Sequence, residues 1–500
     1  MGYHLLTGAT GLLGSFMLRD ALLAELPVVV TVRARNRGEA RNRVEIHLQE
    51  FERQLGRTLP RPVVYAGNLS QQGLGLAVDE IDWLSAHVES VIHSAASLSF
   101  TATAEGEPWA TNVAGTWNLL ALCRRFGAVD FHHVSTAYVC GLRHDTVRES
   151  ELTIGQQFAN PYEASKVLAE RMVNDAAWLR SKTIHRPSII VGDSQTGFSS
   201  TFHGFYRPLQ LSDVLARGRG QGAPRLVTML GLRGDERKNF VPVDWVSKAL
   251  LHIVQNPKHF NRVYHWTNPV PATVEMLEAA IAAAMGDGPS PADQPAPAAD
   301  AQFLVGMDVY RSYLRDDPSF DRSNTESAAG HLPCPVMNTE RLAFLARTAV
   351  AAGFQPPREP LVPQTVDWHA LFEQRLATPT NRRQSAVTSK LNLQLTGPWG
   401  GSWHLEFGSP GTCSSREGLL SNPDGEIRLS TATLEAILDG RWSIAAAIHA
   451  GLVFIAWRRV AADAVERLFA ELISAIRSQG SATARSFDPT AMYAIEPAAN

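Results

Sequence analysis

Short apolar runs rich in β-branched residues alternate with longer segments of helical period from residue 3 to about residue 270. The segment Leu12–Leu23, which directly follows the first apolar run, has the period of an amphipathic helix. Strands that alternate with helices in this way form βαβ units and lie parallel in one sheet. We therefore predict an α/β fold, a Rossmann-type doubly wound parallel sheet. The expected strands are Tyr3–Thr7, Val28–Val32, Val63–Ala66, Ser90–His93, Phe131–Ser135, Thr183–His185 and Val263–Thr267.

The later part of the chain changes pattern more than once. Residues 286–297 consist mainly of Pro, Gly and other small residues, which predicts a loop. Helical period returns over Val336–Gly353, and two prolines then end it. We expect one domain over 1–360, with its core at about 1–270 and substrate-binding parts interleaved at about 197–240 and 271–360.

A second, smaller domain is expected after a linker at 361–388. Residues 402–407 and 426–429 alternate between apolar and polar positions, and 432–438 and 462–476 have helical period. We predict a small C-terminal α+β domain over 389–480, followed by a flexible tail at 481–500. The apolar run Ile444–Trp457 is shorter than the roughly 20 residues of a membrane-spanning helix, so we interpret it as core.

Length, net charge and cysteine content limit the classes of partner that the protein can have. The 500 residues need more than one hydrophobic core. A net charge of −3 with 19% charged residues offers no basic field for nucleic acid, which favours a small-molecule or carrier-bound substrate. Four scattered cysteines lack metal-ligand spacing and suit a reducing cytoplasm. We expect a cytoplasmic protein without signal peptide, transmembrane segment or metal; the pattern leaves its oligomeric state open.

A glycine-rich turn joins the first strand to the first helix. Here the glycines permit a tight turn, close approach of the backbone to a pyrophosphate and packing of helix on strand, while the helix N-terminus favours the negative charge. Glycines alone are a weak signal, and the flanking strand and helix strengthen it. The expected contacts to a dinucleotide are Gly8, Thr10, Gly11, Leu12, Leu13 and Gly14.

Arginine stands where an acidic residue would bind the ribose hydroxyls of NAD. Arg33 follows the second strand, and a guanidinium there can bind a 2′-phosphate with charge-assisted hydrogen bonds. Arg35, Arg37, Arg41 and Arg43 follow, of which some are solvated surface groups. We select Arg33 and Arg43 as contacts and predict NADPH as the cofactor.

Tyr162 and Lys166 lie one turn apart at the start of a predicted helix. A nearby ammonium favours the phenolate, so we expect Lys166 to lower the pKa of Tyr162. Thr136, at the end of an upstream strand, is the candidate for a second hydrogen bond to a substrate oxygen, with Ser135 next in line. Either hydroxyl could instead fix the loop, and Tyr-x-x-x-Lys alone is common by chance.

Taken together, these motifs resemble the extended short-chain dehydrogenase/reductase superfamily. Further segments are similar to its branch of thioester reductase domains and fatty acyl-CoA reductases, the male sterility-like proteins. The resemblance spans roughly residues 3 to 270. It is carried by Gly8-Ala9-Thr10-Gly11-Leu12-Leu13-Gly14, His93-Ser94-Ala95-Ala96, Asn112-Val113-Ala114-Gly115-Thr116, Ser135-Thr136-Ala137-Tyr138-Val139, Tyr162-Glu163-Ala164-Ser165-Lys166, Arg186-Pro187-Ser188-Ile189-Ile190-Val191-Gly192 and Phe240-Val241-Pro242-Val243-Asp244.

The resemblance implies hydride transfer from NADPH to an acyl thioester, bound to CoA or to an acyl or peptidyl carrier protein, giving an aldehyde or an alcohol. Thr136 and Tyr162 would stabilise and protonate the oxyanion, Lys166 would hold the nicotinamide ribose, and Asn112 would order the loop and helix near it. Asn68 replaces the usual Asp of a Gly-Asp-Leu motif. Further implied cofactor contacts are Asn68, Leu69, Ser94, Ala95, Ala96, Pro187, Ser188 and Ile189.

Several alternatives stay open. A hydroxysteroid-type or other ketone reductase of the same superfamily is the nearest, an epimerase or dehydratase is disfavoured by Arg33, and a lipid-binding or sensor protein that binds NADP(H) without turnover is a third. Cys140 is interpreted as a buried thiol rather than a nucleophile. Residues 391–479 faintly resemble the sterol carrier protein type 2 domain, which implies lipid binding; a packed module for assembly is the alternative.

Overall fold

A computed structural model describes residues 2–219, 226–285, 314–375, 389–408, 413–457 and 462–480 of the chain. The chain divides into two compact units, and each is described by itself. The first unit comprises Met1–Phe51 and Val64–Leu361, and the second comprises Glu52–Val63 and Val362–Asn500. The expected loop at 286–297 and the expected tail at 481–500 lie outside the described residues.

A seven-stranded sheet forms the centre of the first unit, in the order β3-β2-β1-β4-β5-β6-β10. The pairs that β1 makes with β2 and β4 are parallel, as are those of β5 with β4 and β6 and that of β10 with β6. The predicted Rossmann-type α/β fold is therefore confirmed. The strands are β1 (Tyr3–Thr7), β2 (Val28–Val32), β3 (Val63–Ala66), β4 (Val88–His93), β5 (Asp130–Val134), β6 (Ser181–Pro187) and β10 (Val263–Trp266).

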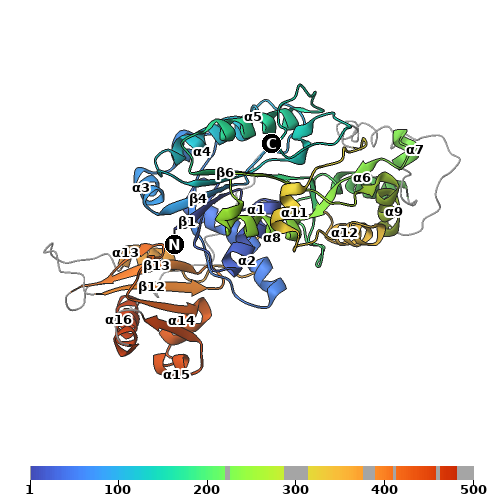
Figure 1. Ribbon diagram of the computed structural model, residues 1–500. Coiled ribbons are helices and arrows are strands. Elements are labelled where there is room, and N and C mark those ends of the chain that lie inside the picture. Colours follow the sequence, from blue (N-terminus) through green and yellow to red (C-terminus); the bar gives the residue numbers. More distant parts are fainter. Residues whose placement is uncertain are drawn as a thin grey trace, which may run out of the picture. The chain divides into compact units, whose positions relative to one another are not determined.

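Helices cover both faces of this sheet (Figure 1). Helix α1 packs with α8, while α4 packs with α5 on the opposite face. The doubly wound arrangement leaves the ends of the strands accessible. The helical elements here are α1 (Leu12–Leu23), α2 (Arg37–Leu55), η1 (Gln72–Gly75), α3 (Val78–His87), η2 (Ala110–Ala114), α4 (Gly115–Cys123), η3 (Ala137–Cys140), α5 (Pro161–Asp175), α8 (Val243–Val254) and η4 (Pro257–His259).

The strand order reverses between β1 and β4. Thr7, the last residue of β1, is the register partner of His93, the last residue of β4. The hydroxyl of Thr7 and Nδ1 of His93 are 2.8 Å apart. In open α/β sheets, ligands bind where neighbouring strands diverge at such a reversal. The glycine-rich turn and the segment after His93 therefore meet at the position where a dinucleotide binds.

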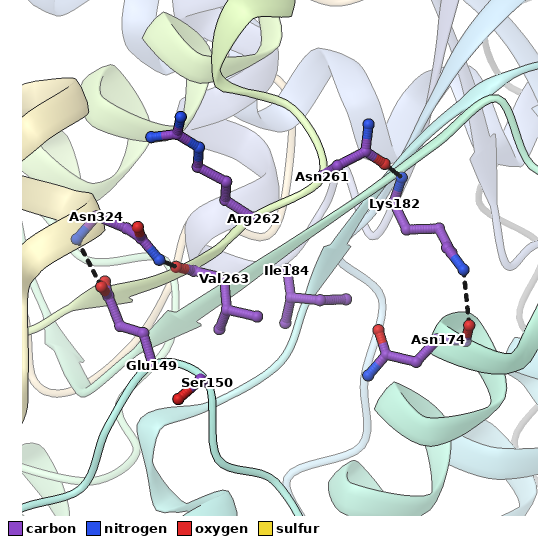
Figure 2. Close-up of a pocket in the computed structure, with 9 residues that line it drawn as sticks. All are labelled: Glu149, Ser150, Asn174, Lys182, Ile184, Asn261, Arg262, Val263 and Asn324. Atoms are coloured by element: carbon purple, nitrogen blue, oxygen red, sulfur yellow. Dashed lines mark hydrogen bonds between the residues drawn. The ribbon is translucent and has the colours of Figure 1, made fainter.

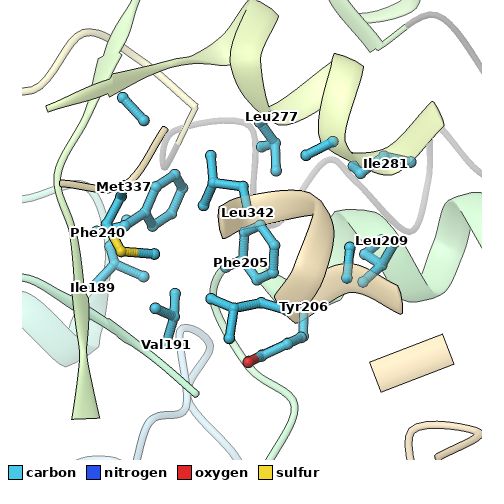
Figure 3. Close-up of a cluster of buried hydrophobic side chains, with 14 of the residues drawn as sticks. Ile189, Val191, Phe205, Tyr206, Leu209, Phe240, Leu277, Ile281, Met337 and Leu342 are labelled. Carbon is cyan, nitrogen blue, oxygen red and sulfur yellow. The ribbon is translucent and has the colours of Figure 1, made fainter. Parts of the chain in front are cut away.

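A subdomain with its own hydrophobic cluster lies beyond strand β7 (Figure 3). Phe205, Tyr206 and Leu342 are buried in this cluster together with Ile189 and Phe240. Described residues of both ranges at about 197–240 and 271–360 thus share one core, and their role in binding substrate stays a prediction. The elements are β7 (Ile189–Val191), α6 (Tyr206–Arg219), α7 (Leu226–Leu230), β8 (Arg237–Lys238), β9 (Phe240–Pro242), β11 (Ala272–Thr273), α9 (Val274–Met285) and α12 (Thr339–Ala351). Helix α11 (Ser323–Ala329) packs instead on β10 of the seven-stranded sheet and on α8.

The second unit is built on a five-stranded mixed sheet in the order β14-β13-β12-β15-β16. Strand β12 pairs parallel with β15, and the other pairs are antiparallel. This confirms the predicted small α+β domain. Its elements are α13 (Trp368–Arg375), β12 (Ser389–Thr396), β13 (Gly401–Phe407), β14 (Cys413–Glu417), β15 (Gly425–Ser430), α14 (Thr431–Leu438), α15 (Ile444–His449), β16 (Val453–Trp457) and α16 (Ala462–Gly480).

Two details of this unit differ from the sequence-based expectation. Helix α13 lies inside the range 361–388 that we expected to be linker, and its residues Trp368 and Phe372 are buried in the core of the unit. The run 444–457, expected to be core, forms α15 and β16, and Phe454 and Trp457 are 57% and 55% exposed. The core interpretation therefore holds for part of the run, since Ala447 and Val453 are buried in the core of the unit, and fails for its exposed aromatic side chains.

Candidate active site

A cleft with a volume of about 610 Å³ runs along the carboxyl ends of β1, β4, β5 and β6. It collects residues from the glycine-rich turn, from the two hydroxyl positions after β5 and from the start of α5. Many of the predicted site residues therefore share one cavity. Its lining residues that we predicted are Gly8, Gly11, Leu12, Leu13, Gly14, Ser94, Ala96, Ser135, Thr136, Tyr162, Lys166, Pro187, Ser188 and Ile189.

The glycine-rich turn forms a cradle that a larger side chain would fill. Gly8 has φ +76°, and a Cβ on it would lie 2.6 Å from the amide nitrogen of Ala95. A Cβ on Gly14 would lie 2.0 Å from the carbonyl oxygen of Gly8. Helix α1 begins inside this turn, so its unpaired amide groups face an anion bound there. The turn thus fits the pyrophosphate of a dinucleotide cofactor.

Thr136 and Tyr162 approach each other across the cleft. Thr136 follows β5 and accepts a hydrogen bond from the amide of Tyr138 at 3.3 Å. Tyr162 lies in the first turn of α5, whose N-cap Asn160 accepts from the amide of Glu163 at 3.0 Å. Burial raises the pKa of Tyr162 to about 12, and its hydrogen bond with Thr136 opposes this rise. Tyr162 is therefore a neutral phenol near neutral pH.

Lys166 lies one turn after Tyr162 and is 2% exposed. Its ammonium donates to the carbonyl oxygen of Val134 at 2.7 Å. Burial lowers the pKa of Lys166 to about 8, and the nearby Glu170 carboxylate opposes this shift. We expected Lys166 to lower the pKa of Tyr162, and this was wrong for the protein without cofactor. Desolvation disfavours the charged form of both side chains and dominates here.

Asn112 holds the surroundings of Lys166 together from η2. Its side-chain amide donates to Ser165 Oγ at 2.9 Å and to the carbonyl of Ser97 at 3.0 Å. Its side-chain oxygen accepts from the amide of Ser97 at 2.8 Å. Asn112 therefore ties the loop after β4 to helix α5, although it does not line the cleft.

Ser135 and Thr136 differ in their hydrogen bonds. Ser135 lines the cleft, and its buried hydroxyl has no hydrogen-bond partner among the residues that the structure describes. The hydroxyl of Thr136 bonds with Tyr162, with the amide of Tyr138 and, at 3.5 Å, with the carbonyl of Pro187. Thr136 is therefore the hydroxyl that is coupled to the tyrosine.

Seven predicted contacts do not line the cleft. Arg33 is exposed after β2, and its carbonyl oxygen accepts from the guanidinium of Arg43. Asn68 accepts from the amide of Ser70 at 3.0 Å, so its side chain already stabilises a turn. Their contact with a cofactor stays a prediction. The seven residues are Thr10, Arg33, Arg43, Asn68, Leu69, Ala95 and Asn112.

The other wall of the cleft consists of residues that sequence reasoning missed. Most of them come from the loop after β4 and from the segment between β7 and α6, while Val134 ends β5, Ile190 lies in β7 and Tyr206 begins α6. Neither segment carries a recognisable motif; the only signal is that each follows the carboxyl end of a strand. These lining residues are Leu98, Ser99, Phe100, Thr101, Val134, Ile190, Thr201, His203, Gly204 and Tyr206.

Cys140 lies outside this cleft, in η3. Burial raises the pKa of its thiol to about 12, and the Glu163 carboxylate adds to the rise. A thiol in this state is a poor nucleophile near neutral pH. Cys140 therefore takes no part in the chemistry of the cleft.

A second hollow lies beside the strands β6 and β10 (Figure 2). Its polar groups bond to one another: the ammonium of Lys182 donates to the carbonyl of Asn174 at 2.7 Å, and Glu149 accepts from the amide of Asn324 at 2.7 Å. These side chains stabilise the edge of the sheet. We therefore place no chemistry in this hollow.

Comparison with known proteins identifies the part of the chain that carries the cleft. Residues 6–250 match the family model described as male sterility protein. We call residues 6–250 the male sterility domain, after the family that they resemble. The male sterility domain is an NAD(P)-binding domain of the thioester reductase type.

Relatives of the male sterility domain occur inside much longer proteins. One component of the linear gramicidin synthase of Brevibacillus parabrevis is 31% identical over 288 residues, which cover 55% of this chain and 5% of that protein. Aldehyde reductase lnaA of Aspergillus flavus is 28% identical over 287 residues, which cover 54% of this chain and 26% of that protein. The chain thus spans a small part of these curated relatives.

Solved structures resemble the same region. The terminal R domain of the myxalamid PKS-NRPS biosynthetic pathway is 28% identical, with a TM-score of 0.59, over 71% of this chain and 93% of that one. The R domain of a nonribosomal peptide synthetase from Mycobacterium tuberculosis is 20% identical, with a TM-score of 0.54 over 71% of this chain and 92% of that one. The second likeness concerns the fold alone.

Within the described ranges, no group of three or more His, Cys, Asp and Glu side chains is placed to hold a metal ion. No helix in the described part of the chain is both long and apolar enough to cross a membrane.

Proposed function

We propose that the male sterility domain uses NADPH to reduce an acyl thioester to an aldehyde and a free thiol. The observation that carries this proposal is that Tyr162 and Lys166 line the same cleft as the glycine-rich turn. Tyr162 is also hydrogen-bonded to Thr136 in this cleft. Bound in the cradle, the cofactor supplies the hydride. The balance is one thioester, one NADPH and one proton in, and one aldehyde, one thiol and one NADP⁺ out.

The residues have distinct roles in this proposal. Tyr162 is a neutral phenol, so it can donate its proton to the thioester oxygen as that oxygen gains negative charge. Thr136 supplies the second hydrogen bond to the same oxygen. Lys166, fixed by the carbonyl of Val134, presents its remaining ammonium hydrogens to the ribose and favours negative charge nearby.

The likeness to an R domain of a PKS-NRPS pathway supports a thioester carried on a carrier protein as substrate. Acyl-CoA is the alternative substrate, since it contains the same thioester bond. A second hydride transfer, to the aldehyde, would give the alcohol. The test is incubation with NADPH and a panel of acyl-CoA, acyl-pantetheine, acyl-carrier-protein and steroid substrates, with products identified by mass spectrometry. Reduction of the steroid ketones alone would identify a ketone reductase, and NADPH binding without any product would indicate a sensor.

We further propose NADPH rather than NADH as the reductant. Arg33 is exposed directly after β2, where an NAD-binding protein of this fold has an acidic residue. The guanidinium of Arg43 approaches the backbone of Arg33, which concentrates positive charge at this position. Paired guanidinium groups suit a 2′-phosphate.

For the second unit we propose a sterol carrier-like role in binding the acyl chain. Its sheet and helices pack around an apolar core, and Trp442, Phe454 and Trp457 expose apolar surface. The test is photo-crosslinking of the whole chain with a long acyl thioester that carries a diazirine near its end. Labels within 389–480 are expected, and labels confined to the cleft would contradict this role.

A further inference from the structure

Among the cleft residues that the sequence did not predict, one ionisable side chain has no role in the proposed reaction. The ionisable residues among those that line the cleft are Tyr162, Lys166, His203 and Tyr206. Tyr162 and Lys166 belong to the reductive site. The hydroxyl of Tyr206 accepts from the amide of Gly192 at 2.8 Å and is buried in the subdomain core. His203 is the remaining one.

The imidazole of His203 is available to a ligand. Within the described part of the chain it makes no hydrogen bond to the protein, and the residue is exposed although it lines the cleft. Desolvation lowers the pKa of His203, and the charge of Arg207 lowers it further. Near neutral pH the ring is therefore neutral, with one nitrogen that donates a hydrogen bond and one that accepts.

The backbone around His203 is held in place. The next residue, Gly204, has φ +54°, and a Cβ on it would lie 3.0 Å from Cγ2 of Ile189. Phe205 and Tyr206 then enter the hydrophobic cluster of the subdomain (Figure 3). Upstream, the hydroxyl of Ser199 donates to the carbonyl of Thr201. The backbone on both sides of His203 is thus fixed by contacts within the protein. Ile189, which the segment approaches at Gly204, also lines the cleft and is a predicted cofactor contact.

A neutral imidazole complements a secondary amide, which also has one donor and one acceptor. We propose that His203 is a specificity-determining residue that hydrogen-bonds an amide of the bound thioester. The amide has two possible sources, the pantetheine arm of the thiol and a peptide bond in the acyl group. A plain hydrocarbon chain would leave the imidazole without a partner when it displaced water. This inference rests on the proposed thioester reduction.

The test compares four thioesters that combine two acyl groups with two thiols. One acyl group is a saturated chain and the other an N-acetylaminoacyl group of similar length; one thiol is pantetheine and the other a simple alkyl thiol. His203→Leu removes the hydrogen bond, and His203→Gln retains donor and acceptor. His144→Leu, at an exposed position outside the cleft, is the matched control.

The expected result is selective. His203→Leu should lower kcat/KM about tenfold for both pantetheine thioesters or for both N-acetylaminoacyl thioesters, because one hydrogen bond to the substrate is lost. The thioester without any amide should change less than about twofold, and His203→Gln should retain most of the activity. An equal loss on all four thioesters, or a loss on none, would overturn the assignment.

A binding measurement separates this inference from the proposed function. If the unmodified protein reduces none of the four thioesters, the proposed function fails, yet the role of His203 can still be decided. Titration of the NADP⁺ complex with pantetheine and with an N-acetylamino acid amide should give a Kd that rises about tenfold in His203→Leu for one of them. Unchanged Kd values for both, or no binding of either, would refute the amide contact.

Discussion

Replacing Tyr162 by Phe removes one oxygen and leaves the rest of the site in place. The ring is 7% exposed and lies 6.0 Å from the ring of Phe100, so the cavity keeps its shape. Thr136 retains the amide of Tyr138 and the carbonyl of Pro187 as partners. Because no buried group is left without a hydrogen bond, the free energy of unfolding should change by no more than about 1 kcal/mol.

The effect on turnover should be much larger. Loss of a positioned proton donor typically lowers rates by about 10²- to 10⁴-fold. By transition-state arithmetic, this corresponds to about 2.7 to 5.5 kcal/mol in the activation free energy. We therefore expect Tyr162→Phe to lower kcat at least about a hundredfold while the Kd of NADPH stays nearly constant. Single-turnover oxidation of NADPH measures the first quantity, and fluorescence titration measures the second.

Tyr264→Phe is the matched control. Its hydroxyl donates to the carbonyl of His259 at 2.6 Å, and Tyr264 does not line the cleft. This control should lose about 1 kcal/mol of stability at most and keep ordinary turnover. Turnover of Tyr162→Phe within about tenfold of the unmodified protein would refute the assignment of Tyr162 as proton donor.

Four further predictions concern the same cleft. Thr136→Ala should lower kcat more than Ser135→Ala, because only the threonine hydroxyl bonds with the tyrosine; the reverse order in steady-state assays would exchange their roles. Arg33→Ala should erase a preference for NADPH over NADH of at least about tenfold, measured by titration, and equal affinities in the unmodified protein would contradict this. Burial gives Lys166 a pKa of about 8, so kcat/KM for NADPH should fall as pH rises through that value and the ammonium loses its charge; a flat profile would exclude the role. Gly14→Ala would place a Cβ 2.0 Å from a carbonyl oxygen, so NADPH binding and thermal stability should both drop, and unchanged calorimetry would contradict the packing argument.

The side of the cleft that the sequence predicts best is the side built from local spacing. Gly8 and Gly14 belong to one turn, and Tyr162 and Lys166 to one helix, so short-range patterns place each pair correctly. The opposite wall is different. Phe100 and His203 come from separate loops, after β4 and after β7, that line the same cleft, and no spacing within either loop indicates this.

The spacing of residues in the sequence also did not predict the protonation states of Tyr162 and Lys166. Four-residue spacing shows that Lys166 and Tyr162 are neighbours, and from this alone a lower tyrosine pKa follows. The structure adds that both side chains are buried, and desolvation is the largest cause that shifts the pKa of each, upward for Tyr162 and downward for Lys166. A phenol that keeps its proton suits reduction, because the thioester oxygen must receive a proton as the hydride arrives.

The apolar run in the second unit shows a third limit, since composition does not specify which side chains face inward. Helix α15 ends at His449, and Gly451, with φ +70°, reverses the chain before β16 begins. In that strand successive side chains point to opposite faces, so Val453 is buried and Phe454 is exposed. If the whole run is assigned to one helix or to the core, the chain reversal at Gly451 is not accounted for. The glycine was the one local sign that the run is two elements, and the alternation after it places an aromatic side chain on the surface.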